Sequence, residues 1–121
     1  AQGYVDSFVW PPDEQWTAET IGRLLLSKRP LRERRVHWPG PLLEATLDLS
    51  GRPLRVFGAH PLRPGRPSFA RERNQTLARL AELCAGAPNC LVLGDLNATE
   101  ASPHFRDLLA RGRLADTRAG R

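Results

Sequence analysis

One stretch of the sequence decides the fold, and it reads Leu91-Val92-Leu93-Gly94-Asp95-Leu96-Asn97-Ala98-Thr99. Its first residues are a short apolar run of β-formers that follows a turn at residues 86–89, a pattern that predicts a buried strand. The run ends at a glycine, and two polar residues follow, Asp95 and Asn97. If the backbone stays extended there, residues two apart lie on the same side, so we expect both polar groups to point into one space.

A carboxylate and a carboxamide at the end of a strand are suited to chemistry on an oxyanion, a water molecule or a hard metal ion. The alternative interpretation is that Asp95 and Asn97 only cap a turn, as Asx side chains often do. These residues alone favour neither interpretation, and the rest of the chain is needed to choose between them.

The composition is that of a folded globular chain. The chain has 121 residues, enough for one domain or less, of which 40% are hydrophobic and 26% charged. No apolar stretch approaches the ~20 residues that span a bilayer, and the start shows no signal-peptide pattern. The chain begins with Ala1 and contains no Met, which suggests a fragment or a processed piece.

The formal net charge of +5 would suit a nucleic-acid partner, but the basic residues are scattered. All are arginines except Lys28, which indicates a compositional bias towards arginine. The one local cluster, at residues 32–35, is expected in a solvated loop, with phosphate or anionic-lipid contact as the alternative. Cys84 and Cys90 lack the spacing and the histidine partners of a zinc site. They are expected as two buried thiols, with a disulfide as the alternative.

The first part of the chain predicts an arm, a strand and a connector. In residues 1–20 the hydrophobic residues follow no sustained helical or strand period, which predicts an irregular arm. Residues 21–121 are predicted to form the sheet and the helices. Residues 21–27 predict a buried strand. Residues 30–41 are charged and rich in proline, which predicts a connector in which Trp38 packs as an anchor.

Residues 43–49 and 54–60 are predicted to form an antiparallel hairpin around a Ser50-Gly51 turn. Hydrophobic and polar residues alternate cleanly in the first segment. In the returning segment, alternate residues form a row on one face of the strand, and the last residue of that row is a histidine next to Pro61. That row is Leu54, Val56, Gly58 and His60.

Two helices flank the opening stretch. The first is predicted from an N-cap at Ser68 to about Ala85, and the second from an N-cap at Ser102 to Gly112. The side chains expected to face inwards are Phe69, Leu77, Leu80, Ala81 and Cys84 on the first helix, and Phe105, Leu108 and Leu109 on the second. The order of strand, hairpin, helix, strand and helix predicts an α/β arrangement with helices packed on a sheet.

His60 is the third candidate functional residue. Histidine is the side chain best suited to transfer a proton, or to stabilise developing negative charge, near neutral pH. A histidine before a proline is often only structural. Its position one helix before a strand that ends in Gly-Asp-x-Asn favours a functional role.

Together these motifs resemble the endonuclease/exonuclease/phosphatase superfamily, which has the fold of pancreatic deoxyribonuclease, abasic-site endonucleases, sphingomyelinases and inositol-polyphosphate phosphatases. The run from Gly22 to Leu31 is similar to its "G-x-x-hydrophobic-LSR-x-P-hydrophobic" strand. Val56-Phe57-Gly58-Ala59-His60-Pro61 resembles "V-x-x-T-H", with alanine for threonine. The opening stretch resembles "V-hydrophobic-GDFN-A-x", with leucine for phenylalanine. The helix and the "GL-x-D" motif that follow are matched by Ser102-Pro103-His104-Phe105 and Leu114-Ala115-Asp116.

The resemblance implies a fold and an activity. The fold is α/β (α+β), part of a four-layer sandwich in which helices flank a mixed sheet. The activity is metal-dependent hydrolysis of a phosphodiester or phosphomonoester with Mg²⁺ or Mn²⁺, on a nucleic acid, a phospholipid or a small phosphate ester. In detail the motifs resemble those of bacterial members of the family, some of which are membrane-anchored. The cellular location of the protein stays open between the cytoplasm and the extracytoplasmic side of a bacterial membrane.

The resemblance also implies roles for the three candidate residues. Asp95 would orient and polarise the attacking water. Asn97 would hold a non-bridging phosphate oxygen, and His60 would stabilise charge on the phosphoryl group. Asp95 and Asn97 would also assist a metal site.

The chain departs from the family pattern because it lacks the early strand with an Asn, the "LQE"-type metal-binding Glu and the late "SDH" pair. We therefore interpret residues 1–121 as a partial, central section of the domain. We expect this polypeptide alone to be inactive and, with one sheet face uncovered, marginally stable or prone to aggregate. The alternatives are a non-catalytic α/β module that binds anionic partners through Arg-rich loops at residues 32–35 and 63–66, and a structural half-domain that pairs with another chain.

Overall fold

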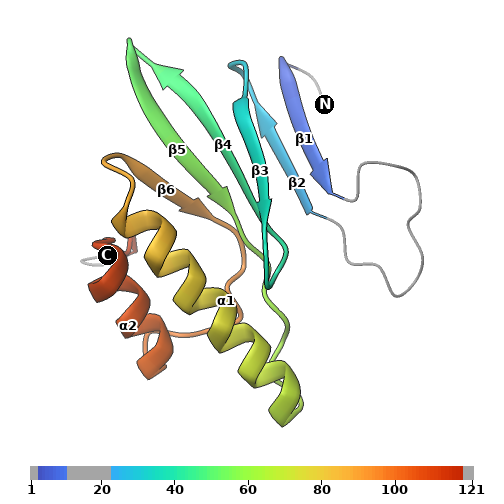
Figure 1. The fold of residues 1–121 in the computed structure, drawn as a ribbon, viewed down its shortest axis with the longest axis vertical. Coiled ribbons are helices and arrows are strands. Elements are labelled where there is room, and N and C mark those ends of the chain that lie inside the picture. Colours follow the sequence, from blue (N-terminus) through green and yellow to red (C-terminus); the bar gives the residue numbers. More distant parts are fainter. Residues whose placement is uncertain (1–2, 11–22, 119–121) are drawn as a thin grey trace.

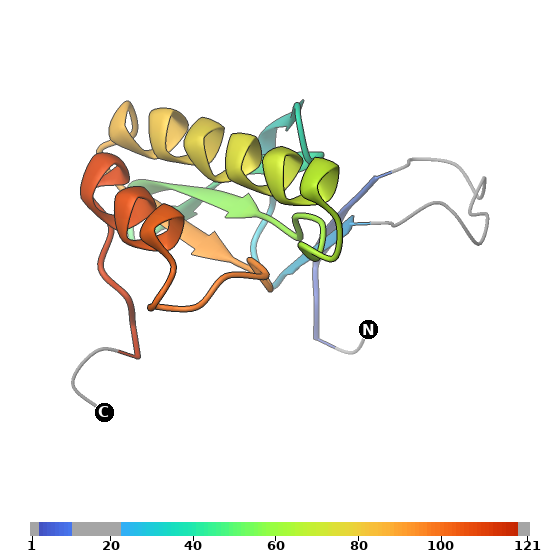
Figure 2. The same cartoon turned by 90° about the horizontal axis from the view of Figure 1, so that it is seen from below.

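The computed structural model describes residues 3–10 and 23–118. The elements are β1 (Asp6–Trp10), β2 (Arg23–Ser27), β3 (Arg32–His37), β4 (Leu42–Leu49), β5 (Arg52–Gly58), α1 (Pro67–Ala85), β6 (Cys90–Leu93) and α2 (Pro103–Gly112). Figure 1 and Figure 2 show α1 and α2 together on one face of a four-stranded sheet. The two-stranded sheet of β1 and β2 packs on its other face. No helix in this described part is long and apolar enough to cross a membrane.

The four-stranded sheet is mixed, in the order β3-β4-β5-β6. The predicted hairpin is confirmed as the antiparallel pair β4 and β5, and its turn places Ser50 and Gly51 at positive φ, 53° and 81°. β5 and β6 are parallel, and α1 is the crossover that such a pair needs. The carboxyl ends of β5 and β6 therefore meet at one edge of the sheet.

β4 and β5 have a hydrophobic core on each face, because successive side chains of a strand point to opposite sides. The core under the helices is formed by Leu42, Phe57, Ala59, Leu77, Leu80, Ala81, Cys84, Phe105 and Leu108. The core between the two sheets is formed by Leu25, Leu31, Leu43, Ala45 and Val56. The sheets approach so closely that a Cβ on Gly58 would lie 2.8 Å from Cδ2 of Leu25.

Two segments predicted to be irregular are strands. β1 lies inside the predicted arm of residues 1–20 and pairs antiparallel with β2, with Phe8 opposite Leu25. The prediction failed there because the pairing partner, not a local pattern, orders this short segment. The predictions for residues 1–2 and 11–22 lie outside the described residues.

β3 lies inside the predicted connector of residues 30–41. It is charged because it is an edge strand, where exposed arginines are tolerated and discourage pairing with other chains, and its register shifts between Arg32 and Arg35. Trp38 contacts Trp10 edge-on, with ring centroids 6.0 Å apart, but 60% of it is exposed. It is therefore not a buried anchor.

The helices agree with the predictions except at the start of α1. α1 has Arg66, not Ser68, as its N-cap, because Pro67 at the first helical position has its φ already fixed for a helix. Phe69 is exposed, whereas the other four residues predicted to face inwards are buried. α2 has the predicted N-cap, Ser102, although its side chain makes no capping hydrogen bond. β6 is confirmed as a strand, but the prediction that it is buried is wrong. It is only half-buried, because it lies at the edge of the described sheet.

Candidate functional site

The carboxyl ends of β5 and β6 bring His60 and Asp95 to one cavity. The backbone N–H of Ala59 donates to the carbonyl of Leu93 at 3.0 Å, so the segment after β5 still runs beside the end of β6. A cavity of about 510 Å³ opens there, and both His60 and Asp95 line it. The two residues that the sequence placed at neighbouring strand ends therefore share one space.

Gly94 makes this close approach possible. Its φ is +132°, in a region that side chains rarely adopt, and a Cβ on it would collide with the carbonyl oxygen of Ala59. Only glycine lets the segment after β6 pass so close to the segment after β5. The glycine of the Gly-Asp-x-Asn motif thus has a structural role that directly positions Asp95.

The backbone after β6 is not extended, so the premise on which Asp95 and Asn97 were expected to point to the same side does not hold. Asn97 has φ 51°, and its backbone N–H donates to Oδ1 of Asp95 at 2.9 Å. This is the Asx turn that the alternative interpretation described. The Asn97 amide instead donates through Nδ2 to the carbonyl of Pro61 at 2.7 Å, and Asn97 is not among the described residues that line the cavity.

Arg23 is a residue of this site that the sequence analysis missed. It is 6% exposed and lines the same cavity. Its Nη2 donates to the carbonyl of His60 at 2.6 Å and to that of Gly40 at 3.0 Å. Burial lowers the pKa of the Arg23 guanidinium. The signal was available in β2, where Arg23 stands in the same alternating row as the buried Leu25 and Ser27.

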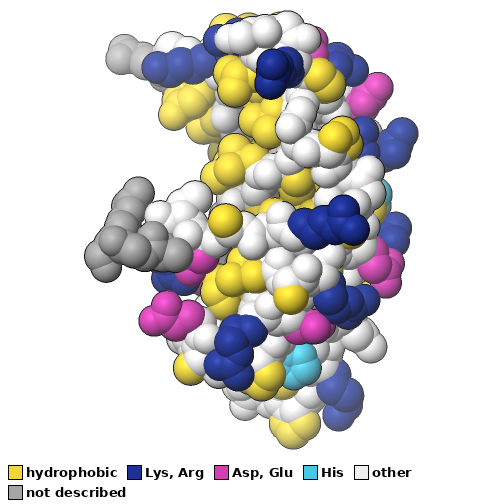
Figure 3. Space-filling view, turned by 90° about the vertical axis from the view of Figure 1, so that its left-hand side faces the viewer, with side chains coloured by type: hydrophobic (Ala, Val, Ile, Leu, Met, Phe, Trp, Pro, Cys, Tyr) yellow, Lys and Arg dark blue, Asp and Glu magenta, His cyan; other side chains and the backbone are white. Residues whose placement is uncertain are grey.

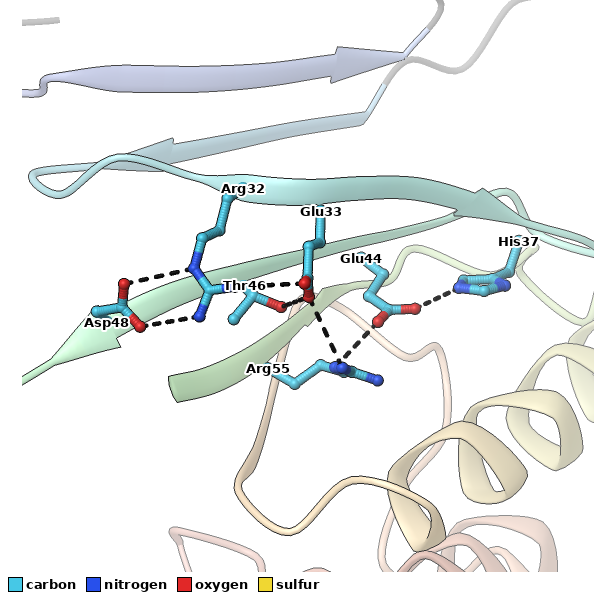
Figure 4. Close-up of polar contacts among 7 residues, drawn as sticks. All are labelled: Arg32, Glu33, His37, Glu44, Thr46, Asp48 and Arg55. Carbon is cyan, nitrogen blue, oxygen red and sulfur yellow. Dashed lines mark hydrogen bonds and ion pairs between the residues drawn. The ribbon is translucent and has the colours of Figure 1, made fainter. Parts of the chain in front are cut away.

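A second polar cluster lies on β3, β4 and β5 (Figure 4). At its centre lies Glu44, which is 2% exposed. Its carboxylate accepts a hydrogen bond from Nε2 of His37 at 2.5 Å and forms an ion pair with Nε of Arg55 at 3.1 Å. Arg32 pairs with Asp48 at 2.9 Å. These charges are matched within the chain, which indicates a structural cluster rather than a ligand site.

The Arg-rich segments differ in how their charges are used. In the first segment, Arg32 is paired within this cluster and Arg34 pairs with Asp6 at 2.5 Å; both lie on a strand and not in a loop. In the second, Arg63 and Arg66 are exposed, and neither forms an ion pair with a described carboxylate. Arg66 lies over the ring of Phe69, 5.4 Å from its centroid.

Among the described residues, no group of three or more His, Cys, Asp and Glu side chains is arranged to hold a metal ion. The oxygen donor that lines the cavity is the Asp95 carboxylate, and the Asn97 amide oxygen lies outside that lining, beside Pro61. These are donors of the kind that Mg²⁺ accepts, and Mg²⁺ is usually held by one or two carboxylates together with water and substrate phosphate. The site therefore fits Mg²⁺ or Mn²⁺ if water and the substrate phosphate complete the coordination of the ion.

Apolar side chains reach the surface beside the site. Figure 3 views the molecule from the side on which β6 and α2 lie in Figure 1, and it shows hydrophobic side chains lining a hollow in this face. Leu24 and Leu26 of β2 and Leu93 of β6 line the cavity of the site and are 54%, 41% and 47% exposed. These leucines give the cavity of the site an apolar wall beside its polar residues.

Residues 4–121 match the Endonuclease/Exonuclease/phosphatase family. A beta toxin from Staphylococcus aureus with bound magnesium ions is similar to this chain with a TM-score of 0.61 and 18% identity, over 77% of this chain and 39% of that one. A sphingomyelinase C from Streptomyces griseocarneus is similar with a TM-score of 0.60 and 19% identity, over the same two shares. A search of curated proteins found no significant match. The chain spans less than half the length of these solved structures, which confirm the predicted fold class.

Proposed function

Because the chain belongs to the endonuclease/exonuclease/phosphatase family, whose members hydrolyse phosphate esters, we propose that the protein hydrolyses a phosphodiester or a phosphomonoester with the help of Mg²⁺ or Mn²⁺. The observation that carries the proposal is the shared cavity of His60 and Asp95 at the ends of two parallel strands. The chain covers less than half of the solved relatives. The activity is therefore proposed for the whole protein, with further metal ligands outside these residues.

Asp95 is the proposed group that orients and polarises the attacking water. Its Oδ1 is held by the N–H of Asn97, which fixes the direction of the carboxylate, and Oδ2 remains for the water or the metal. A general acid or base held in this way contributes typically 10²–10⁴-fold to a rate.

His60 is the proposed group that stabilises negative charge on the phosphoryl group. The buried Arg23 holds the carbonyl of His60, so the imidazole starts from a fixed backbone. Asn97 uses one amide hydrogen on Pro61, and the second is left to donate to a phosphate oxygen.

Asp95 and Asn97 are the proposed metal ligands in this chain. Asp95 lines the cavity, whereas Asn97, whose Nδ2 is held by Pro61, would contribute its Oδ1 from beside it. A bound Mg²⁺ or Mn²⁺ supplies positive charge that neutralises the phosphate. The substrate class is proposed only as far as the phosphate ester, which includes nucleic acid, phospholipid and small esters, because the fold does not fix it.

The proposal is tested on the whole protein with bis(p-nitrophenyl) phosphate and p-nitrophenyl phosphate, with and without Mg²⁺. We expect Mg²⁺-stimulated hydrolysis of one of them, and a loss of about 10²–10⁴-fold in His60→Ala. The matched control is His104→Ala, because His104 is also exposed but lies at the start of α2. Equal rates in His60→Ala and the wild type would contradict the assignment of His60, and no Mg²⁺-stimulated hydrolysis would contradict the proposed activity.

The second candidate function is binding of an anionic partner without catalysis, and it is favoured by Arg63 and Arg66, which are exposed and have no described carboxylate as a partner. Their double replacement by glutamine would then abolish binding to a polyanion such as heparin and leave the hydrolysis of p-nitrophenyl esters unchanged. Unchanged binding in the double variant would rule this function out.

A further inference from the structure

A pair of cysteines lies at the start of β6, at the end of the strand away from Asp95. Cys84 is in the last turn of α1, and Cys90 is the first residue of β6. Both thiols are free, and their Sγ atoms are 2.6 Å apart. We propose that Cys84 and Cys90 are a modification site, a dithiol that small disulfides convert to an intramolecular disulfide between α1 and β6.

Backbone hydrogen bonds hold both cysteines in place. The N–H of Ala87 donates to the carbonyl of Cys84 at 3.0 Å, and thereby closes the end of α1. Cys90 stands opposite Arg55 in the parallel pair, and the N–H of Arg55 donates to the carbonyl of the preceding Asn89 at 2.9 Å. The two sulfurs already lie 2.6 Å apart in the folded chain, so each thiol meets the other at a high effective concentration.

The surroundings of the two thiols are unequal. The hydrogen bond with Cys84 lowers the pKa of Cys90, and the positive charge of Arg55 acts in the same direction. The same hydrogen bond and burial raise the pKa of Cys84. Because the thiolate is the attacking form, Cys90 is the first nucleophile and Cys84 the resolving thiol.

A small reagent can reach the pair. A cavity of about 630 Å³ is lined by both cysteines, by Leu54 and by residues 112–114. Cys84 is buried, whereas Cys90 is only half-buried. The side chain with the lowered pKa is therefore also the more accessible one.

The reaction is thiol–disulfide exchange with a small disulfide such as oxidised glutathione. The Cys90 thiolate attacks one glutathione sulfur, and the S–S bond of the reagent breaks to release one glutathione thiolate. Cys84 then loses its proton to solvent and attacks the Cys90 sulfur, which releases the second glutathione. Two protein thiols are oxidised to one disulfide, and one oxidised glutathione is reduced to two thiols.

The sequence provides a direct assay. Trypsin cleaves after Arg79 and Arg106 and at no lysine or arginine between them, so residues 80–106 form one peptide with both cysteines. The whole protein is equilibrated in mixtures of reduced and oxidised glutathione, quenched, alkylated, digested and analysed by mass spectrometry. We expect a peptide that is two hydrogens lighter than the reduced form and carries no alkyl group, reversed by dithiothreitol.

The same titration in denaturing guanidinium chloride separates the folded geometry from simple proximity in sequence. The intramolecular disulfide should form at a ratio of oxidised to reduced glutathione at least about tenfold lower in the folded protein, because folding raises the effective concentration. Cys84→Ser should give only the glutathione adduct of Cys90, and folded Cys90→Ser should give little adduct, because Cys84 is buried and its pKa is raised. Glutathione adducts alone in the wild type, or equal titrations with and without denaturant, would overturn the proposal.

Discussion

The backbone N–H of Asn97 donates a 2.9 Å hydrogen bond to Oδ1 of Asp95, the carboxylate that lines the candidate cavity. Asp95 can therefore take part in the Asx turn and also have a catalytic role, so the two interpretations of this motif do not exclude each other. The turn occupies one carboxylate oxygen and fixes its direction, and the other oxygen is left for chemistry. A variant that keeps the turn but removes the charge can separate the two roles.

Asp95→Asn is that variant. Its amide oxygen can still accept the hydrogen bond from Asn97, so the free energy of unfolding should change by less than about 0.5 kcal/mol. The rate of phosphate-ester hydrolysis should fall about 10²–10⁴-fold, because the charge that polarises the water is gone. Asp95→Ala, which also removes the acceptor, should lose a further ~1 kcal/mol of stability. Urea unfolding and initial rates measure both, and a wild-type rate in Asp95→Asn would refute the role of Asp95.

Gly94→Ala should be among the more damaging single-methyl substitutions in this chain. The new Cβ would meet the carbonyl oxygen of Ala59, which is backbone and cannot swing away, at a φ of +132°. We expect a loss of more than about 2 kcal/mol in the free energy of unfolding, measured by urea titration. Gly65→Ala is the control, because a Cβ there meets nothing within 4 Å, and an equal loss in both variants would contradict the close approach.

Local sequence patterns were sufficient to predict the elements whose own residues show hydrophobic alternation, a turn or a helix start. The hairpin was predicted from alternation and a Ser-Gly turn, and α2 from a serine followed by a proline at its first position. β1 and β3 were missed for a common reason. Their residues are ordered by pairing with β2 and β4, and a strand that gains its order from a distant partner need show no period of its own.

The candidate site was predictable in its components but not in its geometry. Strand-end spacing was enough to bring His60 and Asp95 together, because parallel strands must end at one edge. The positive φ of Asn97 was not foreseen, since asparagine tolerates both extended and left-handed backbone. Arg23 was missed because a charged residue at a strand end is normally taken as exposed, whereas here two backbone carbonyls accept its hydrogen bonds.

Glu44→Gln should destabilise the protein, because the buried carboxylate is the common partner of His37 and Arg55. Removing its charge leaves Arg55 without its nearer anion, and we expect a loss of about 1–3 kcal/mol in urea unfolding. Asp48→Asn removes an exposed ion pair with Arg32 and should cost less stability than Glu44→Gln, because solvent screens the two exposed charges. A smaller loss in Glu44→Gln than in Asp48→Asn would show that burial of Glu44 does not determine the strength of this cluster.

Asp6 should make the stability of the folded chain depend on pH in the acid range. A hydrogen bond from Arg34, and another from the N–H of Leu31, lower the pKa of Asp6 from 3.8 to about 2. Because the folded pKa is below the unfolded one, the stabilisation is present above about pH 4 and is lost as the pH falls towards 2. The Tm difference between the wild type and Asp6→Asn should therefore be largest near neutral pH and shrink through this window.

Arg34→Gln tests the cause of that pH dependence. It removes the largest contribution to the lowered pKa of Asp6 but leaves the hydrogen bond from Leu31 at 2.8 Å. In this background the substitution Asp6→Asn should change Tm less at neutral pH, and the change should vary less between about pH 4 and 2. Thermal unfolding of the four proteins by circular dichroism gives the complete cycle. A Tm difference between the wild type and Asp6→Asn that stays constant with pH would show that Asp6 does not carry this dependence.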